Sequence, residues 1–148
     1  MTRWQAANPD FGQTVRDAVL SMPAAQHLGF AFGAIAPGAV EIIQPFRKEL
    51  TQHDGFFQGG VLGALADFAG GSAAGTLLPA GWANMTIDYT VKILAPAKGA
   101  KLVARGLVIH PGHLTTVASA DVFSVDGETE TLCVTSLVTM RNIRLRAS

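Results

Sequence analysis

Asp67 is the only charged residue between Gly55 and Leu78, in a segment made largely of glycine, alanine and larger apolar residues. A buried carboxylate is costly unless it is hydrogen-bonded or used in a reaction. Gly59, eight residues earlier, stands where we expect a helix to begin, and the free amides and dipole of a helix start favour negative charge. Its amide, aided by the side-chain NH2 of Gln52, would stabilise a carbonyl oxygen that becomes negative, while Asp67 activates water or attacks directly. The spacing therefore predicts acyl-transfer chemistry.

Three other patterns favour packing over chemistry. Residues 59–63 fit neither G-x-G-x-x-G nor a Walker loop. Residues 70–74 lack the last glycine of a nucleophile elbow and lie inside the expected helix, so we interpret Ser72 as a packing residue. His110 and His113 flank a Pro-Gly turn without further ligands, so we expect a hairpin tip there and no metal site.

Hydrophobic periodicity predicts a short helix, two strands, a long helix and four more strands, in that order. The long helix covers residues 58–78, and its glycines suit the close approach of other backbones. Residues 84–94 alternate apolar and polar side chains, which predicts a half-buried strand with Met85, Ile87 and Tyr89 on one face. Together these elements predict an α+β domain with a mainly antiparallel sheet wrapped around a long central helix. The other expected elements are a helix at 10–21 and strands at 30–36, 39–46, 102–110, 114–125 and 130–140.

Composition excludes several classes of partner. The 148 residues carry no net charge and no Lys/Arg run, so the clustered cations that a nucleic-acid backbone requires are missing. Asp67, several glycines and Pro79 interrupt the longest apolar stretch, 55–83, before it reaches the about 20 residues of a membrane span. The first residues lack the apolar core of a secretory signal, and Cys133 is the single cysteine. We therefore expect one cytoplasmic domain, residues 1–148, without a nucleic-acid or membrane partner.

The residues around Asp67 resemble the PaaI-type acyl-CoA thioesterases of the hotdog-fold superfamily. In that family an Asn or Gln precedes a His-Gly-Gly at the mouth of the central helix, and an Asp follows one or two turns into it. Gln52, Gln58-Gly59-Gly60 and Asp67 match this pattern, and residues 94–99 are similar to the family's next element. The resemblance spans about residues 25–141, and the strand order predicted above agrees with it.

The resemblance implies a hotdog fold and hydrolysis of an acyl-CoA thioester, with CoA as part of the substrate and no metal or redox cofactor. Thr86 matches a Ser or Thr beside the catalytic water, so it would orient the water that Asp67 activates. The Gly59 amide would polarise the thioester carbonyl. Gln58 replaces the family's usual His, which supports the helix mouth, while a His stands at position 53 instead. We expect the replacement of this His by Gln58 to affect the rate of hydrolysis and the range of substrates.

Substrate contacts are expected at both ends of the thioester. Cationic side chains would contact the CoA phosphates, although each of them also fits an ordinary surface charge. Aromatic side chains would line a pocket for an aromatic or medium-chain acyl group, or they belong to the core. By resemblance alone, an aryl or arylacetyl group is favoured. The candidate substrate contacts are His53, Gly60, Phe57, Phe68, Arg105, Lys98 and His113.

Two other functions stay open at this point. Hotdog acyl-CoA hydratases and dehydratases pair a carboxylate with a catalytic His, and only His53 could take that part here. A non-catalytic acyl-CoA-binding protein is the second alternative, for which Gln58 in place of the His is the indication.

Helix geometry predicts that two chains share the site. Eight residues at 1.5 Å of rise place the Gly59 amide and the Asp67 Cα about 12 Å apart, too far for both groups to serve one carbonyl carbon. A two-fold axis that sets two such helices antiparallel would bring Gly59 of one subunit opposite Asp67 of the other. The resemblance implies the same arrangement, so we expect a homodimer or a homotetramer.

Overall fold

The computed structural model describes residues 3–148; residues 1 and 2, which the single-domain prediction includes, lie outside the described residues. Within them the helices are α1 (Phe11–Leu20), α2 (Pro23–Leu28) and α3 (Gly59–Gly75), with a short 3-10 helix η1 (Lys48–Leu50). The strands are β1 (Ala31–Ala36), β2 (Ala39–Pro45), β3 (Trp82–Ile93), β4 (Lys101–Pro111), β5 (Thr115–Asp126) and β6 (Thr129–Arg144). They form a six-stranded sheet in the order β1-β2-β4-β5-β6-β3, in which all neighbouring strands are antiparallel.

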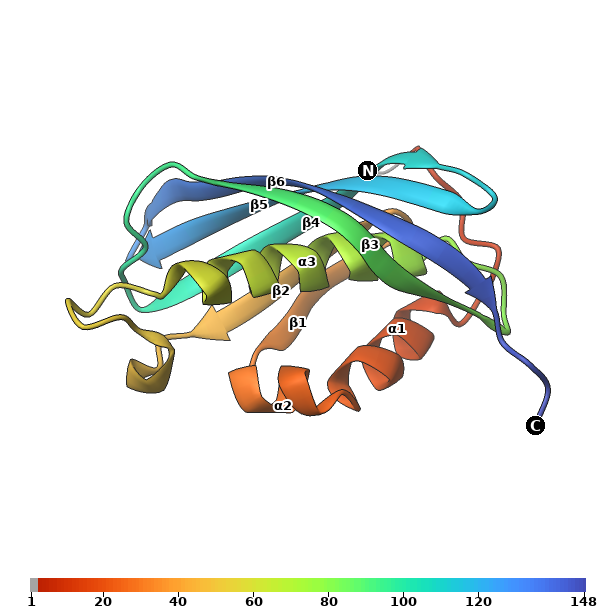
Figure 1. Cartoon of the computed structure of the whole chain (residues 1–148), viewed down its shortest axis with the longest axis horizontal. Helices are drawn as coiled ribbons and strands as arrows, with labels where there is room; N and C mark the ends of the chain where they lie inside the picture. Colours follow the sequence, from red (N-terminus) through yellow and green to blue (C-terminus); the bar gives the residue numbers. More distant parts are fainter. Residues whose placement is uncertain (1–2) are drawn as a thin grey trace.

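The sheet curves around α3, and α1 and α2 lie on the side of α3 away from β4, β5 and β6 (Figure 1). Small residues in one row across the sheet allow α3 to approach it closely. These residues, paired in register across β4, β5 and β6, are Gly106, Ala120 and Ser136. A methyl group at Gly106 would overlap the carbonyl oxygen of Ala69 in α3. On the helix side, a Cβ at Gly70 would lie 2.9 Å from a methyl group of β6. These glycines therefore serve the close packing that the sequence predicts.

The C-terminal end of α3 is fixed by Thr76. Its hydroxyl donates to the carbonyl of Ala73 at 2.6 Å and accepts a 2.7 Å hydrogen bond from the amide of Gly38. Gly38 has φ of 76° in the turn between β1 and β2, a conformation that favours glycine. This hydroxyl thus ties the β1–β2 hairpin to the end of α3, which comes three residues before the predicted limit at position 78.

β3 is an edge strand whose side-chain alternation reverses at a bulge. The register with β6 shifts directly after Thr86, which faces α3. Beyond the bulge it is Tyr89 that packs against α3, whereas Met85 and Ile87 are each 61% exposed. The prediction of one apolar face along residues 84–94 is therefore wrong, because the extra residue of the bulge moves the later side chains to the opposite face.

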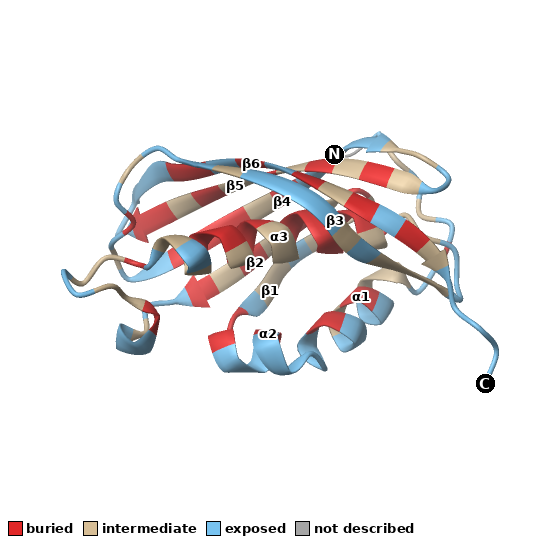
Figure 2. Cartoon of the chain, in the orientation of Figure 1, coloured by how far each residue is buried: buried red, intermediate tan, exposed pale blue. Residues whose placement is uncertain are grey.

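Burial follows the same architecture. Figure 2 shows buried residues on α3 and, alternately, along β4, β5 and β6, while most of β3 is exposed. The α+β fold with an antiparallel sheet around a long helix is confirmed. The sequence did not predict α2. This helix begins at Pro23, because proline is favoured in the first turn of a helix. In residues 3–148, no helix is both long and apolar enough to cross a membrane.

Candidate active site

The Asp67 carboxylate and the Thr86 hydroxyl meet between α3 and β3. Thr86 Oγ1 donates a 2.6 Å hydrogen bond to Asp67 Oδ1. No residue in the described range 3–148 donates a hydrogen bond to the other carboxylate oxygen. One oxygen is thus held in place, while the other can take a proton from water.

Burial raises the pKa of Asp67 above its ordinary value, and the hydrogen bond from Thr86 lowers it in part. A general base transfers protons best when its pKa lies near the working pH. The direction of the shift therefore suits a carboxylate that accepts a proton from water.

A cavity of about 400 Å³ begins at the Asp67–Thr86 pair and extends between α1, α3 and β3. Leu78 and Trp82 line its other end, and most of the remaining lining is apolar. Its size falls within the roughly 300 to 1,000 Å³ of ordinary small-molecule sites. A carboxylate at the edge of such a cavity suits a ligand with one polar reacting group and an apolar remainder.

Gln58 organises the N-terminal end of α3. Its side-chain Oε1 accepts hydrogen bonds from the amides of Gly60 at 2.6 Å and Val61 at 3.2 Å, and it thereby acts as the N-cap. No described residue accepts a hydrogen bond from the amide of Gly59. The free donor at this helix start is therefore Gly59, whereas the amide of Gly60, predicted as a substrate contact, is already paired.

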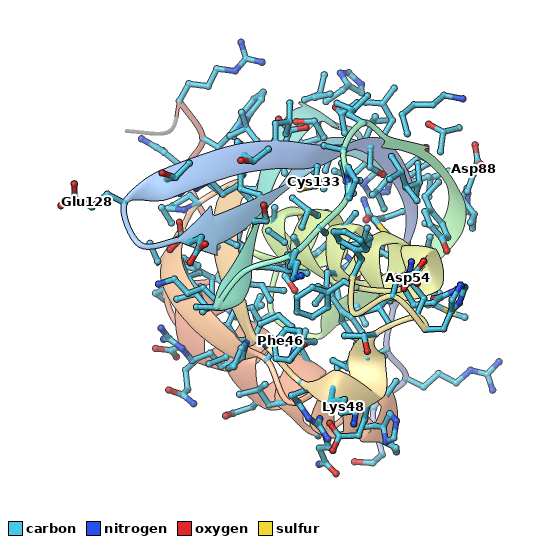
Figure 3. The ribbon with its side chains drawn as sticks, turned by 90° about the vertical axis from the view of Figure 1, so that its left-hand side faces the viewer. Phe46, Lys48, Asp54, Asp88, Glu128 and Cys133 are labelled. Carbon is cyan, nitrogen blue, oxygen red and sulfur yellow. The ribbon has the colours of Figure 1, made fainter. Side chains whose placement is uncertain are left out.

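The loop before α3 fixes the side-chain oxygen of Gln52, while its NH2 group, the predicted donor, has no hydrogen-bond partner within residues 3–148. The side-chain oxygen of Gln52 accepts a hydrogen bond from the amide of Asp54, so it closes a local turn at the surface. His53 is 89% exposed and lies 3.4 Å from the carboxylate of Asp54. In Figure 3, Asp54 lies beside the first turn of α3, on the loop that leads into it. The loop thus presents exposed polar groups near Gly59, and within the chain His53 makes no contact with Asp67.

The predicted aromatic contacts differ in their surroundings. Phe57 is 3% exposed and packs against Phe46 with ring centroids 5.6 Å apart, so it belongs to the core and is not free to contact a substrate. Phe68 packs against Phe30 at 4.9 Å and also lines the cavity at Asp67. Only Phe68 of the two reaches the candidate site.

The three predicted phosphate contacts lie in different parts of the molecule. Lys98 lies over the ring of Phe56, in the loop before α3, at 5.4 Å. Arg105 pairs with both oxygens of Glu130 at 2.8 and 2.9 Å and with Glu41, and these bonds raise its pKa further. His113 packs against Trp82 at 5.6 Å, beyond the C-terminal end of α3. Within one chain, only Lys98 lies near the helix mouth.

Two groups at the cavity escaped prediction. Asn84 donates to the carbonyl of Gly71 at 3.0 Å and lines the cavity beside Thr86. α1 supplies the opposite wall through Val15 and Ala18. Their spacing in the sequence carries no chemical signal, because the tertiary packing of α1 on α3 creates the wall.

Ser72 is 4% exposed and its hydroxyl has no partner within residues 3–148, in keeping with a packing residue.

The described residues hold no group of three or more His, Cys, Asp or Glu side chains that could bind a metal ion. Cys133 is buried, and Figure 3 shows it between the sheet and α3.

Solved structures of known proteins share this architecture. A thioesterase family protein from Silicibacter pomeroyi is 31% identical, with a TM-score of 0.88 over 90% of this chain and 98% of that one. Thioesterase HI1161 from Haemophilus influenzae is 27% identical, with a TM-score of 0.81 over 91% of this chain and 92% of that one. The predicted hotdog fold is confirmed by this likeness.

Sequence comparison agrees. The Halobacterium salinarum protein named "Putative esterase VNG_1336C" is 34% identical over 100 residues. That match covers 64% of this chain and 66% of the relative, just under two thirds of its length. The family model described as "Thioesterase superfamily" matches residues 54–131, which include α3 with Asp67 and β3 with Thr86. The chain therefore belongs to the thioesterase superfamily.

Proposed function

We propose that this protein hydrolyses acyl-CoA thioesters, with Asp67 as the residue that activates water. The main observation in support of this proposal is the hydrogen bond between Thr86 and Asp67 at the edge of an apolar cavity. The superfamily supports thioester hydrolysis in general; the CoA substrate and the roles of the residues are the proposal.

The reaction needs one proton acceptor and one donor to the carbonyl oxygen. Asp67 takes a proton from water as the water oxygen attacks the thioester carbon, and the Gly59 amide stabilises the negative charge that develops on the carbonyl oxygen. The C–S bond then breaks, and the proton passes to the CoA sulfur. Direct attack by Asp67 would form an anhydride that water hydrolyses, with the same products. Thr86 orients Asp67 in either route.

Two protomers supply the two halves of this site in the proposal. The Gly59 amide and Asp67 lie about 12 Å apart along α3, so one thioester is not served by both from a single chain. A Cβ at Gly59 would lie 3.1 Å from Ile93 near the end of β3, whereas Asp67 bonds to Thr86 near its start. Antiparallel pairing of two β3 edges would therefore set Gly59 of one protomer near Asp67 of the other.

The surface of β3 supports such a dimer. One edge of β3 has no neighbouring strand among the described residues. Large apolar side chains on β3 are exposed, from 45% for Tyr89 to 61% for Met85 and Ile87. An unpaired edge with exposed apolar residues is typical of a contact surface. A tetramer of such dimers and a cytoplasmic location stay predictions.

The phosphates of CoA are assigned to the helix mouth in this proposal. Lys98 supplies the cation there, beside the ring of Phe56. Arg105 is excluded, because two carboxylates already occupy its guanidinium. The exposed side chain of His53 completes the polar surface near the Gly59 amide.

The test is release of free CoA thiol from a panel of acyl-CoAs by the purified protein. Thiol release with first-order dependence on enzyme supports the proposal. Hydration of an enoyl-CoA without thiol release would instead assign a hydratase, and tight acyl-CoA binding without turnover would assign a binding protein.

A further inference from the structure

Gly75 is a glycine that the packing of the chain does not require. Its φ is not positive, and a Cβ there would meet only Val15 Cγ2 at 3.5 Å and Asn84 Nδ2 at 3.8 Å, both ordinary contact distances. At Gly70, in contrast, an added Cβ would clash with β6. Glycine is the least favourable helix residue after proline, so a side chain at position 75 would stabilise α3. Its absence leaves space in the cavity that Gly75 lines.

The cavity is long in the direction of α3. Asp67 marks one end and Gly75 lies eight residues further along the helix, about 12 Å away at 1.5 Å per residue. Leu78 and Trp82 line the cavity beyond Gly75. An extended alkyl chain advances about 1.3 Å per methylene, given C–C bonds of about 1.5 Å, so roughly nine carbons span this distance. A single aromatic ring on the carbonyl would fill roughly half of it.

We propose that this cavity takes a linear, medium-chain acyl group of about eight to ten carbons, and that the missing side chain of Gly75 sets the chain length. The inference rests on the proposed thioesterase function and adds its substrate class. Val15 and Ala18 of α1 line the cavity beside Gly75, and Val15 Cγ2 lies 3.5 Å from the position that a Cβ at residue 75 would take. A methyl group at position 75 would occupy the space of the last one or two carbons.

The test compares Gly75→Ala with wild type on straight-chain acyl-CoAs from C2 to C14 and on benzoyl-CoA. For wild type, kcat/KM should rise roughly fourfold per methylene up to about C8 to C10. Gly75→Ala should lower kcat/KM for the longest good substrate about tenfold or more, and leave C2 and C4 within about twofold of wild type. Gly75→Leu should shorten the preferred chain further.

A matched control separates cavity filling from a general effect of removing a glycine. Gly12 lies in α1, and a Cβ there would meet nothing within 4 Å. Both Gly12→Ala and Gly75→Ala should raise the melting temperature, but only Gly75→Ala should change the chain-length profile. An unchanged profile for Gly75→Ala, or a wild-type preference for benzoyl-CoA over every linear chain, would overturn the inference.

Direct binding keeps this test separate from the proposed reaction. In the Asp67→Asn background, which removes charge repulsion at the cavity edge, decanoate should bind, and adding Gly75→Leu should weaken its binding about tenfold or more. No thiol release from any acyl-CoA, together with decanoate binding that depends on Gly75, would refute the proposed hydrolysis and retain the cavity assignment. Decanoate binding that ignores Gly75 would overturn the cavity assignment whatever the hydrolytic activity.

Discussion

Thr86 Oγ1 lies 2.6 Å from Asp67 Oδ1 because a bulge in β3 keeps Thr86 on the helix side while the residues beyond it change sides. If this hydrogen bond positions the carboxylate, Thr86→Val should lower kcat about tenfold or more with little change in KM, since the shape is kept and the donor is lost. Thr86→Ser, which keeps the hydroxyl, should retain most of the activity. Steady-state kinetics of both variants checks this, and equal rates for Val and Ser would show that the hydroxyl has no part.

Asp67→Asn should lower kcat by roughly 100-fold or more, because both the base and the nucleophile roles need an ionised oxygen. In wild type, kcat/KM should fall on acidification with a midpoint above the ordinary aspartate value of about 3.9, because burial raises the pKa of Asp67. A pH–rate profile with thiol detection checks both statements. Near wild-type turnover in a folded Asn variant would remove Asp67 from the mechanism.

The same substitution should stabilise the fold at neutral pH. Because the pKa of Asp67 is raised in the folded state, that state binds more protons than the unfolded state between the two pKa values, and wild-type stability falls as the pH rises through this interval. The melting temperature of Asp67→Asn should therefore exceed that of wild type by its full amount at pH values above the folded-state pKa of Asp67. The difference should become smaller as the pH falls towards the unfolded-state pKa of about 3.9. Thermal unfolding from pH 7 downwards measures it. A less stable Asn variant at pH 7 would show that burial does not oppose the charge.

Gln58 caps α3 through its side-chain oxygen, so its removal should affect both stability and activity. Gln58→Ala should cost about 1 kcal/mol, typical of a lost N-cap, and lower kcat/KM by loosening the turn that presents the Gly59 amide. Gln58→His should retain substantial activity. Unimpaired kinetics and stability of the Ala variant would show that the side chain is a bystander.

Subunit mixing tests the shared site. Asp67→Asn protein and Gly59→Leu protein should each be inactive, and after exchange a statistical mixture should recover about a quarter of wild-type activity, because half of the dimers hold one intact site of two. Exchange is followed with two differently tagged chains. No recovery despite exchange, or a fully active monomer, would contradict the shared site.

The sequence predicted α3 and the sheet well because their signals are local. Asp67 was recognised as a candidate because it is the lone carboxylate in a segment of small residues. The alternation of apolar and polar side chains indicated the strands on both sides of the tight turns. The bulge in β3 was missed because Met85, Ile87 and Tyr89 continue the alternation across it, so the pattern itself carries no trace of the extra residue. Thr86 was singled out only through the family resemblance.

Two side-chain contacts around the start of α3 could not be predicted from the sequence. Gln52 turns back to the Asp54 amide, and Phe57 packs into the core against Phe46. Both outcomes depend on the path of the loop between η1 and α3, which the hydrogen bond from the Gln58 amide to the Leu50 carbonyl at 3.0 Å helps to fix. A sequence pattern does not reveal such a contact in advance. The role of Arg105 was likewise decided by Glu130, which lies next to it only after the sheet forms.

The contact between Gly106 and the Ala69 carbonyl divides the molecule into a part that must stay constant and a part that can diverge. Backbone lies against backbone there, so a larger residue at Gly106 would push α3 away from the sheet, and the position of Asp67 on α3 depends on this close packing. α1 is buried only through Val15 and Val19, and it forms the opposite wall of the same cavity. Mutations on α1 can therefore alter the acyl preference while the reacting groups keep their geometry, which gives this architecture a separate route for changing specificity during evolution or in the laboratory.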